Sequence, residues 1–362
     1  MRAAETGRES TSCAAGGEGP TIRAGAIRAR CGLIARWLQS TQIETMRLFR
    51  HFSPFPGDAR GAVLVLGNFD GVHRGHQAVI ARCGALARAE SRPHGVVTFE
   101  PHPRALFRPQ DPPFRLTPLR VKAHLLDALG VDLLVNLHFD VAFAQRSAEN
   151  FVTEVLHQGL GVGHVVIGYD FVFGQGRAGN AALLQKLGRE LGFGVTIVDP
   201  VAADTGAVFS ATRIREHLTA GQPRAAAELL GRDWEIDGRV EQGDQRGRTI
   251  GFPTANLGLG DYLRPAPGVY AVRAGIERQG SVEWHDAVAN LGTRPTVNGT
   301  DLRLEVHLLA FTGDLYGQHV RVALIDWIRA ERKFAGLDEL KAQIAQDVVT
   351  ARAIHAAGSP TI

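Results

Sequence analysis

The residues best suited to chemistry in the first half of the chain lie in one short stretch, residues 67–76, which read G-N-F-D-G-V-H-R-G-H. They follow the apolar run 62–66, a predicted buried strand. In open α/β sheets, ligands bind beyond the carboxyl ends of the strands. A helix that begins near Gly75 would direct free N–H groups at this loop, and such a terminus favours an anion. His73 and His76 flank that terminus and could stabilise the negative charge on a phosphate under attack.

A tight turn with two ordinary surface histidines is the alternative explanation, and it would be favoured for an isolated H-x-G-H. Here G-x-F-D-G stands directly ahead, after a predicted strand and before a predicted helix. This context favours a phosphate site. The candidate nucleotide-binding residues of the loop are Gly67, Asn68, Phe69, Asp70 and Gly75.

Three later segments could contribute to the same site. Residues 98–103, T-F-E-P-H-P, follow a second predicted strand, and a rigid turn is the alternative there. Residues 168–174, G-Y-D-F-V-F-G, could line a slot for a flat ring, although phenylalanine usually packs in a core. Residues 210–215, S-A-T-R-I-R, open a predicted helix and would suit a triphosphate, with a capped amphipathic helix as the alternative. The candidate residues in and beside these segments are Asp170, Phe171, Phe173, Arg177, Ser210, Thr212 and Arg213.

The second half of the chain holds a glycine-rich loop and a polar pair within residues 238–256, G-R-V-E-Q-G-D-Q-R-G-R-T-I-G-F-P-T-A-N. Such a loop can bring backbone N–H groups close to phosphates. Thr254 and Asn256 are two residues apart, so in an extended segment both oxygens face the same way. They could share a magnesium ion, which prefers hard oxygen ligands. A hairpin loop with an exposed polar pair is the alternative. The candidate phosphate-binding glycines are Gly243, Gly247 and Gly251.

Glu305 is the candidate general base of the second half. It lies in residues 302–308, L-R-L-E-V-H-L, where the leucines and Val306 alternate on one face and Glu305 shares the polar face. Periodicity alone favours a solvent-exposed glutamate. A base that accepts a hydroxyl proton also needs a polar, accessible place.

The elements that must position these residues form two predicted domains, over 46–231 and 232–354. In the first, strands alternate with helices, which predicts a parallel sheet with helices on both faces. Ser147 and Ser210 stand where N-caps are expected. The predicted strands are 62–67, 95–99, 132–137, 164–168 and 194–198, and the predicted helices are 75–89, 118–129, 147–157, 180–191, 211–219 and 223–230.

The second domain shows short alternating runs separated by glycine-rich turns, which predict a small antiparallel β-barrel. A helix over 337–350 is predicted to follow it. Residues 1–45 are rich in small residues and arginine, and we predict a disordered extension or a mis-assigned start, with Met46 as the better start. Residues 355–362 are predicted to be a loose tail. The runs of the barrel are 234–240, 269–274, 282–291, 302–309 and 319–328.

Composition indicates a soluble, cytoplasmic enzyme. Hydrophobic residues make up 44% of the 362 residues, and the formal net charge is only +3. No apolar run is long enough for a membrane span, and no dense basic tract indicates nucleic acid as a partner. The three cysteines lack metal-ligand spacing, and Cys83 is predicted to be a small apolar residue on a helix. We therefore expect small-molecule substrates. The sequence indicates no oligomeric state.

The segments of the first half, taken in order, resemble the nucleotidyltransferase module of the bacterial bifunctional riboflavin kinase/FMN adenylyltransferase (FAD synthetase) family. H-x-G-H alone is shared more widely, but its combination with T-F-E-P-H-P and G-Y-D-F-V-F-G is narrow. In the second half, G-F-P-T-A-N, P-G-V-Y (267–270), N-L-G-T-R-P-T (290–296), L-E-V-H-L and L-Y-G (315–317) resemble the riboflavin kinase module. The resemblance covers about residues 46–350.

For the first domain the resemblance implies a Rossmann-like fold and adenylyl transfer, in which the phosphate of FMN attacks the α-phosphate of ATP and pyrophosphate leaves. His73 and His76 would stabilise the charge at the α-phosphate. The backbone at Asn68 and Phe69 would lie close to the nucleotide. The residues implied near the flavin are Asp170, Phe171, Phe173 and Arg177, and those implied near the pyrophosphate are Ser210, Thr212 and Arg213.

For the second domain the resemblance implies transfer of the γ-phosphate of ATP to the ribityl 5′-hydroxyl of riboflavin. Thr254 and Asn256 would hold Mg²⁺, Glu305 would be the catalytic base, and residues 243–251 would cover the nucleotide. ATP, riboflavin and FMN are the implied substrates, and Mg²⁺ is the implied cofactor.

Two departures from the family pattern keep alternatives open. The family often has two serines where this chain has Ser210-Ala211, and an aspartate where it has Ala310. One alternative is therefore a member that retains a single activity. Another is a different nucleotidyltransferase, such as a pantetheine-phosphate or cytidylyl enzyme, with a ligand-binding barrel. G-F-P-T-A-N and N-L-G-T-R-P-T argue against the second alternative.

Overall fold

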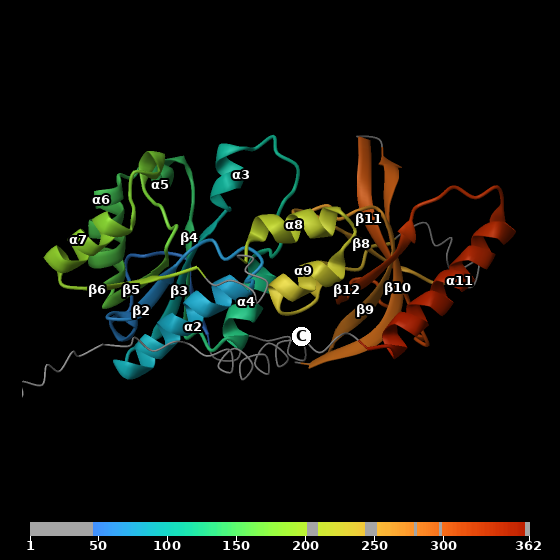
Figure 1. Cartoon of the computed structure of the whole chain (residues 1–362), viewed down its shortest axis with the longest axis horizontal. Helices are drawn as coiled ribbons and strands as arrows, with labels where there is room; N and C mark the ends of the chain where they lie inside the picture. Colours follow the sequence, from blue (N-terminus) through green and yellow to red (C-terminus); the bar gives the residue numbers. More distant parts are fainter. Residues whose placement is uncertain (1–45, 201–208, 243–251, 279–280, 297–298, 359–362) are drawn as a thin grey trace, which may run out of the picture.

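The computed structural model describes residues 46–200, 209–242, 252–278, 281–296 and 299–358. The predicted fold class is confirmed, because a parallel six-stranded sheet with helices precedes a curled antiparallel six-stranded sheet and a C-terminal helix (Figure 1). Helices α8 (Ala211–Thr219) and α9 (Pro223–Leu230) lie between the two sheets.

The parallel sheet has the strand order β1-β4-β3-β2-β5-β6. Its central strands are almost wholly buried, as expected for a parallel sheet covered on both faces. The three-residue edge strand β1 was not predicted, because so short a run carries no measurable periodicity. The strands are β1 (Arg47–Phe49), β2 (Val63–Leu66), β3 (His94–Glu100), β4 (Leu133–His138), β5 (His164–Gly168) and β6 (Gly194–Val198).

The predicted helices of this domain are present, and the short helices 57–59, 103–107, 141–144 and 175–177 were not predicted. The predicted helix 147–157 is a single α-helical turn that continues as a π-helix, and Ser147 caps it as expected. Cys83 is buried on α2, where burial raises the pKa of its thiol to about 12, so its structural role is confirmed. The helices are η1 (Gly57–Ala59), α2 (Arg74–Ala89), α3 (Pro103–Phe107), α4 (Leu119–Ala128), α5 (Val141–Ala144), α6 (Ala148–Asn150), η2 (Phe151–Leu160), η3 (Gln175–Arg177) and α7 (Ala181–Leu191).

The antiparallel sheet has the strand order β7-β12-β9-β10-β11-β8. It curls back on itself, since Glu241, just after β7, pairs with Asn256 of β8 at the opposite edge. The helix α11 (Leu337–Ala356) packs on its outer face and runs further than the predicted end near residue 350. The strands are β7 (Trp234–Arg239), β8 (Ala255–Gly258), β9 (Gly268–Arg278), β10 (Ser281–Thr296), β11 (Gly299–Leu308) and β12 (His319–Ala330).

The two parts of the chain share one hydrophobic cluster and several polar contacts. The indole Nε1 of Trp234 donates to the carbonyl of Leu116 at 2.9 Å, and Arg120 on α4 forms ion pairs with Asp237 and Glu277 of the second sheet. These contacts attach α4 and the segment just before it to the second sheet. Within the described residues, no helix is long and apolar enough to cross a membrane.

Candidate active sites

The two histidines of the H-x-G-H loop form a stacked pair at the start of α2. His73 is the N-cap, and its Nδ1 accepts the backbone N–H of His76 at 3.3 Å. The two ring centroids lie 3.6 Å apart, with 17° between the ring planes. Gly75 permits this arrangement, because a Cβ there would stand 3.2 Å from the His73 ring and from the Cβ of Phe209. The sequence prediction that the loop precedes a helix and holds both histidines at its terminus is confirmed.

Both imidazoles are held neutral. Burial and, to a lesser degree, the nearby cation of Arg232 lower the pKa of His73 to about 4, against the opposing effect of Asp70. Burial, followed by His73 and Lys122, also lowers the pKa of His76 well below its usual value. Because Nδ1 of His73 accepts a hydrogen bond, its single proton lies on Nε2. The pair can therefore donate hydrogen bonds to a phosphate without carrying a full charge.

A titration of the His73 ring in isotopically labelled protein is expected to show a midpoint near pH 4 rather than 6.5. Between these values the unfolded chain binds a proton that the folded chain does not bind. The free energy of unfolding should therefore fall as the pH falls through this window, and it should fall less in a His73→Asn variant. A ring that titrates near pH 6.5 would contradict the buried, neutral pair.

The loop ahead of the pair is held in a strained backbone conformation. Phe69 and Val72 have φ angles of 48° and 41°, and Gly71 has a φ angle of 87°. Such φ values persist only where the surroundings fix them. The carbonyl of Asn68 accepts from Lys122 Nζ at 2.8 Å, and a Cβ at Gly67 would stand 2.9 Å from the Phe69 ring.

Asp70 is an anchor of this loop, which differs from the phosphate contact predicted from the sequence. Its buried carboxylate accepts the backbone N–H groups of Leu116 and Thr117 at 2.9–3.1 Å. Arg215 of α8 donates to it at 2.6 Å. Burial raises the pKa of Asp70, but the cations of Arg215 and Arg115 outweigh this effect. The net pKa lies below its usual value, so the carboxylate stays ionised. Its oxygens already have protein donors, and a phosphate would be repelled by its charge.

The N-terminus of α8 lies beside that of α2, since Phe209 is in reach of Gly75. Ser210 caps α8 by accepting the N–H of Arg213 at 3.3 Å, so the absence of a hydroxyl at Ala211 does not remove the cap. Thr212 is exposed and Arg213 is half-buried. Two helix N-termini thus converge on one place, where their free N–H groups favour an anion.

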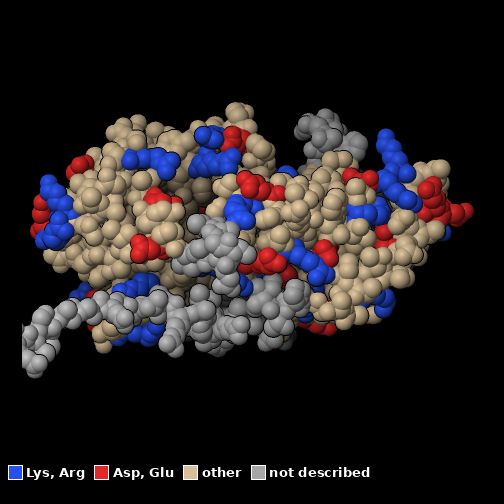
Figure 2. All heavy atoms as spheres, in the orientation of Figure 1, with Lys and Arg blue, Asp and Glu red and all other residues tan. Residues whose placement is uncertain are grey.

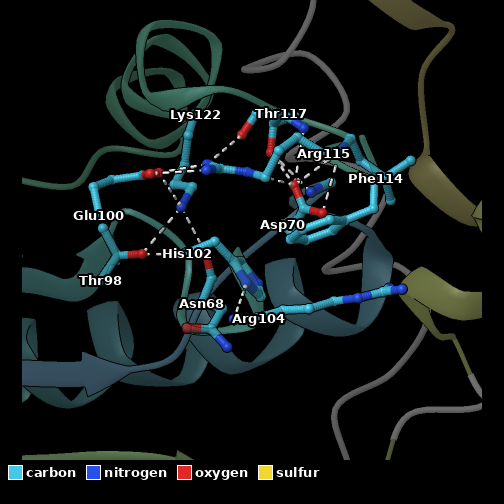
Figure 3. Close-up of polar contacts among 12 residues, drawn as sticks. Asn68, Asp70, Thr98, Glu100, His102, Arg104, Phe114, Arg115, Thr117 and Lys122 are labelled. Carbon is cyan, nitrogen blue, oxygen red and sulfur yellow. Dashed lines mark hydrogen bonds and ion pairs between the residues drawn. The ribbon is translucent and has the colours of Figure 1, made fainter. Parts of the chain in front are cut away.

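A buried polar network behind the loop was not predicted as part of the site (Figure 3). Lys122 is completely buried and donates to Asn68, Thr98 and Glu100. Glu100 in turn forms a bidentate ion pair with Arg115. The segment 98–103 gave a signal for Thr98 and Glu100, but only the fold brings Arg115 and Lys122 beside them.

The residues predicted near a flavin follow β5, which neighbours β2 in the parallel sheet, so they lie at the same edge. Asp170 and Arg177 are exposed, and Phe171 is half-buried. Phe173 is buried and packs against Phe151 at 5.5 Å, so it is a core residue and offers no face to a ligand, contrary to the prediction. Among the described residues, no hydrogen bond joins this segment to the histidine pair. Two exposed aromatic side chains add apolar surface here: Tyr169, after β5 and within the predicted segment 168–174, and Phe107, after β3, which was not predicted.

The candidate residues of the second sheet form a row across three strands. Asn256 of β8 is opposite Glu305 of β11, and Glu305 is opposite Asn290 of β10. Residues directly opposite each other in antiparallel strands share a face. Glu305 is exposed while Leu304 and Val306 are buried, so the predicted alternation is confirmed. The side chains of Asn256 and Glu305 therefore lie within reach of one small ligand.

Side chains of β11 contact the chain on both sides of the loop between β7 and β8. His307 Nδ1 contacts the carbonyl of Pro253, just before β8, at 2.8 Å, and Arg303 pairs with Glu241, just after β7, at 3.1 Å. Thr254 is half-buried beside this contact. Gly243, Gly247 and Gly251 lie outside the described residues. Ala310 is exposed in the turn after β11, with a φ angle of 56°, and lies away from the row.

Comparisons with known proteins assign both halves of the chain. The family model described as FAD synthetase matches residues 56–213, and the one described as riboflavin kinase matches residues 230–355. The bifunctional riboflavin kinase/FMN adenylyltransferase of Escherichia coli K12 is 46% identical over 293 residues, which are 81% of this chain and 92% of the relative. The chain belongs to this family. The relatives of the same name from Haemophilus influenzae and Bacillus subtilis are 42% and 38% identical, over 81% and 79% of this chain and 94% and 90% of their own lengths.

A solved structure agrees with the fold over both halves. A Streptococcus pneumoniae protein described as a macrolide-efflux protein superposes with a TM-score of 0.74 and 32% identity. The superposition covers 85% of this chain and 99% of that protein. The arrangement of a parallel sheet followed by a curled antiparallel sheet therefore occurs in that protein as well.

Proposed function

We propose that this chain phosphorylates riboflavin to FMN and then adenylylates FMN to FAD, with ATP as the donor in both steps. The observation that carries the proposal is that the two family models match consecutive parts of one chain, each of which has its own candidate catalytic group. We assign 46–231 to adenylyl transfer and 232–354 to the kinase.

In the adenylyl transfer, a phosphate oxygen of FMN attacks the α-phosphorus of ATP, and the bond to the β-phosphate oxygen breaks. No protein nucleophile is required, since positioning and charge stabilisation suffice. The neutral, stacked His73 and His76 supply N–H donors where charge develops. The paired termini of α2 and α8, with Thr212 and Arg213, support the leaving pyrophosphate. Phe171, with the exposed Tyr169 and Phe107, offers flat apolar surface to the flavin ring.

In the kinase step, the 5′-hydroxyl of riboflavin attacks the γ-phosphorus of ATP, and ADP leaves. Glu305 accepts the hydroxyl proton, which its exposed position on the polar face of β11 allows. Asn256, directly opposite on β8, lies close enough to bind the same reacting groups.

Mg²⁺ fits the residues beside Glu305. The hydroxyl of Thr254 and the amide oxygen of Asn256 are hard oxygen donors two residues apart, and no described residue donates a hydrogen bond to either of them. The ion would neutralise phosphate charge during the transfer. These two residues would hold it, together with phosphate oxygens of the nucleotide.

We further propose small molecules rather than nucleic acid as ligands, and the cytoplasm as the place of action. On the face drawn in Figure 2, basic and acidic side chains are interspersed in small groups, without the large basic surface typical of nucleic-acid binding. The two departures, Ala211 and Ala310, lie at a helix start that Ser210 caps and in an exposed turn, which favours two retained activities over one.

Incubation of the purified chain with riboflavin, ATP and Mg²⁺ tests the proposal. Chromatography should show FMN first and FAD later, with ADP and pyrophosphate as by-products. A single-activity member would stop at FMN or would use only supplied FMN. If neither flavin nucleotide forms, the proposal is wrong and another nucleotidyltransferase activity should be sought.

A further inference from the structure

Lys122, on α4, is a completely buried cation with no substrate role in the proposed reaction. Its Nζ lies 2.8 Å from the carbonyl oxygen of Asn68, 3.1 Å from Thr98 Oγ1 and 3.4 Å from a carboxylate oxygen of Glu100 (Figure 3). Burying an ammonium group is costly unless its partners compensate. The question is therefore which function of the protein justifies the cost of burying this cation against the loop 67–76.

Neutralising Glu100 is not that function. Glu100 already forms a bidentate ion pair with Arg115, whose position next to Asp70 is fixed by the same network. Without Lys122, Glu100 would still have a cationic partner. The shortest contact of Lys122 is instead with the Asn68 carbonyl.

That contact fixes the orientation of the peptide group between Asn68 and Phe69. In a trans peptide the C=O and N–H groups point in opposite directions. With the carbonyl directed at Lys122 and at Thr98 Oγ1, the N–H of Phe69 must point away from them. No described residue accepts a hydrogen bond from this N–H.

Phe69 transmits this orientation to the histidine pair. Its φ angle of 48° is unusual for a residue with a side chain, and on one side its ring lies so near Gly67 that a Cβ there would stand 2.9 Å from it. On the other side the ring lies edge-on to His76, with centroids 5.3 Å apart and 74° between the planes. A change in the orientation of the Asn68 carbonyl would therefore move the Phe69 ring that packs against His76.

We propose that Lys122 is a positioning residue for adenylyl transfer, which fixes the Asn68–Phe69 peptide and, through the Phe69 ring, the imidazole of His76. The inference rests on the proposed function of His76. It adds a buried group from α4, far from the loop in sequence, to the residues on which FAD formation depends.

The test compares Lys122→Met with Lys186→Met, a matched control at an exposed lysine on α7. With supplied FMN, kcat for FAD formation should fall roughly tenfold to a hundredfold in Lys122→Met, while KM for FMN stays near the wild-type value. Riboflavin phosphorylation, measured on the same protein, should be unchanged. The ring resonances of His76 should shift in Lys122→Met and not in Lys186→Met.

The outcomes separate the inference from the proposed function. If Lys122→Met keeps its kcat while His76→Ala loses FAD formation, the inference is overturned and the proposed function stands. If His76→Ala itself forms FAD normally, the proposed function of the loop fails first. Should Lys122→Met also lose kinase activity, Thr98→Val decides, since it removes the other donor to the Asn68 carbonyl. A lower kcat with kinase retained supports the inference, and an unchanged kcat overturns it.

Discussion

FAD formation from supplied FMN is expected to fall by roughly a hundredfold to a thousandfold when His76 is replaced by alanine, while riboflavin phosphorylation continues unchanged. The reason is that the imidazole is an uncharged hydrogen-bond donor at the N-terminus of α2. It is held in place by stacking on the His73 ring and by an edge-to-face contact with the Phe69 ring. Water in the resulting space would not be oriented in advance for the developing charge. Initial rates with FMN and ATP, and separately with riboflavin and ATP, measure the two steps.

His73→Asn serves as a companion variant, because asparagine can still cap the helix while it lacks the imidazole. We expect a loss of FAD formation similar to that of His76→Ala, with little loss of thermal stability. His157, at the end of the π-helix, is a matched control position whose change to alanine should leave both rates near wild type. Loss of both reactions in His76→Ala would argue that the residue serves the fold and not one site.

FMN formation is the step expected to disappear when Glu305 is replaced by glutamine. The substitution keeps the size of the side chain and removes the proton acceptor, for which a loss of roughly a hundredfold to ten-thousandfold is typical. Adenylylation of supplied FMN should proceed normally, because Glu305 lies in the second sheet, outside the parallel-sheet domain. Assays of ADP release with riboflavin and of FAD formation with FMN give the two rates.

Glu283→Gln is the matched control for this variant, since Glu283 is also an exposed glutamate on the same sheet, on β10. It should keep both activities. If Glu305→Gln phosphorylated riboflavin at the wild-type rate, the base would have to be another residue, and the row of Asn256, Glu305 and Asn290 would lose its assigned role.

Local sequence patterns predict the positions of His73, His76 and Glu305. The order of strand, glycine loop and helix fixed the position of His73 and His76, because a cap and the helix that it begins are neighbours in sequence. The alternation of Leu304, Glu305 and Val306 likewise gave the face of the glutamate, since a strand has a period of two. Both depend only on residues a few positions apart.

The parts that were not predicted depend on contacts between distant segments. The sequence predicts Asp70 as a phosphate ligand, but its carboxylate accepts hydrogen bonds from the backbone amides of Leu116 and Thr117. These two residues lie 46 and 47 positions away in the chain. Lys122 contacts Asn68 over a separation of 54 residues. No local pattern encodes such pairs, since they follow from which strands neighbour each other. The prediction for Phe173 is wrong because the same sequence pattern, a phenylalanine among glycines, occurs whether the ring packs in the core or faces a ligand.

The central claim, that one chain performs two successive steps at separate sites, is tested most directly by mixing two variants, each impaired in one of the two steps. Glu305→Gln and His76→Ala are each incubated with riboflavin, ATP and Mg²⁺, alone and together. Alone, the first should make neither FMN nor FAD, and the second should accumulate FMN. Together they should produce FAD, because FMN released by one variant is adenylylated by the other. A mixture that accumulates FMN without any FAD, or a His76→Ala sample that makes FAD unaided, would contradict the account.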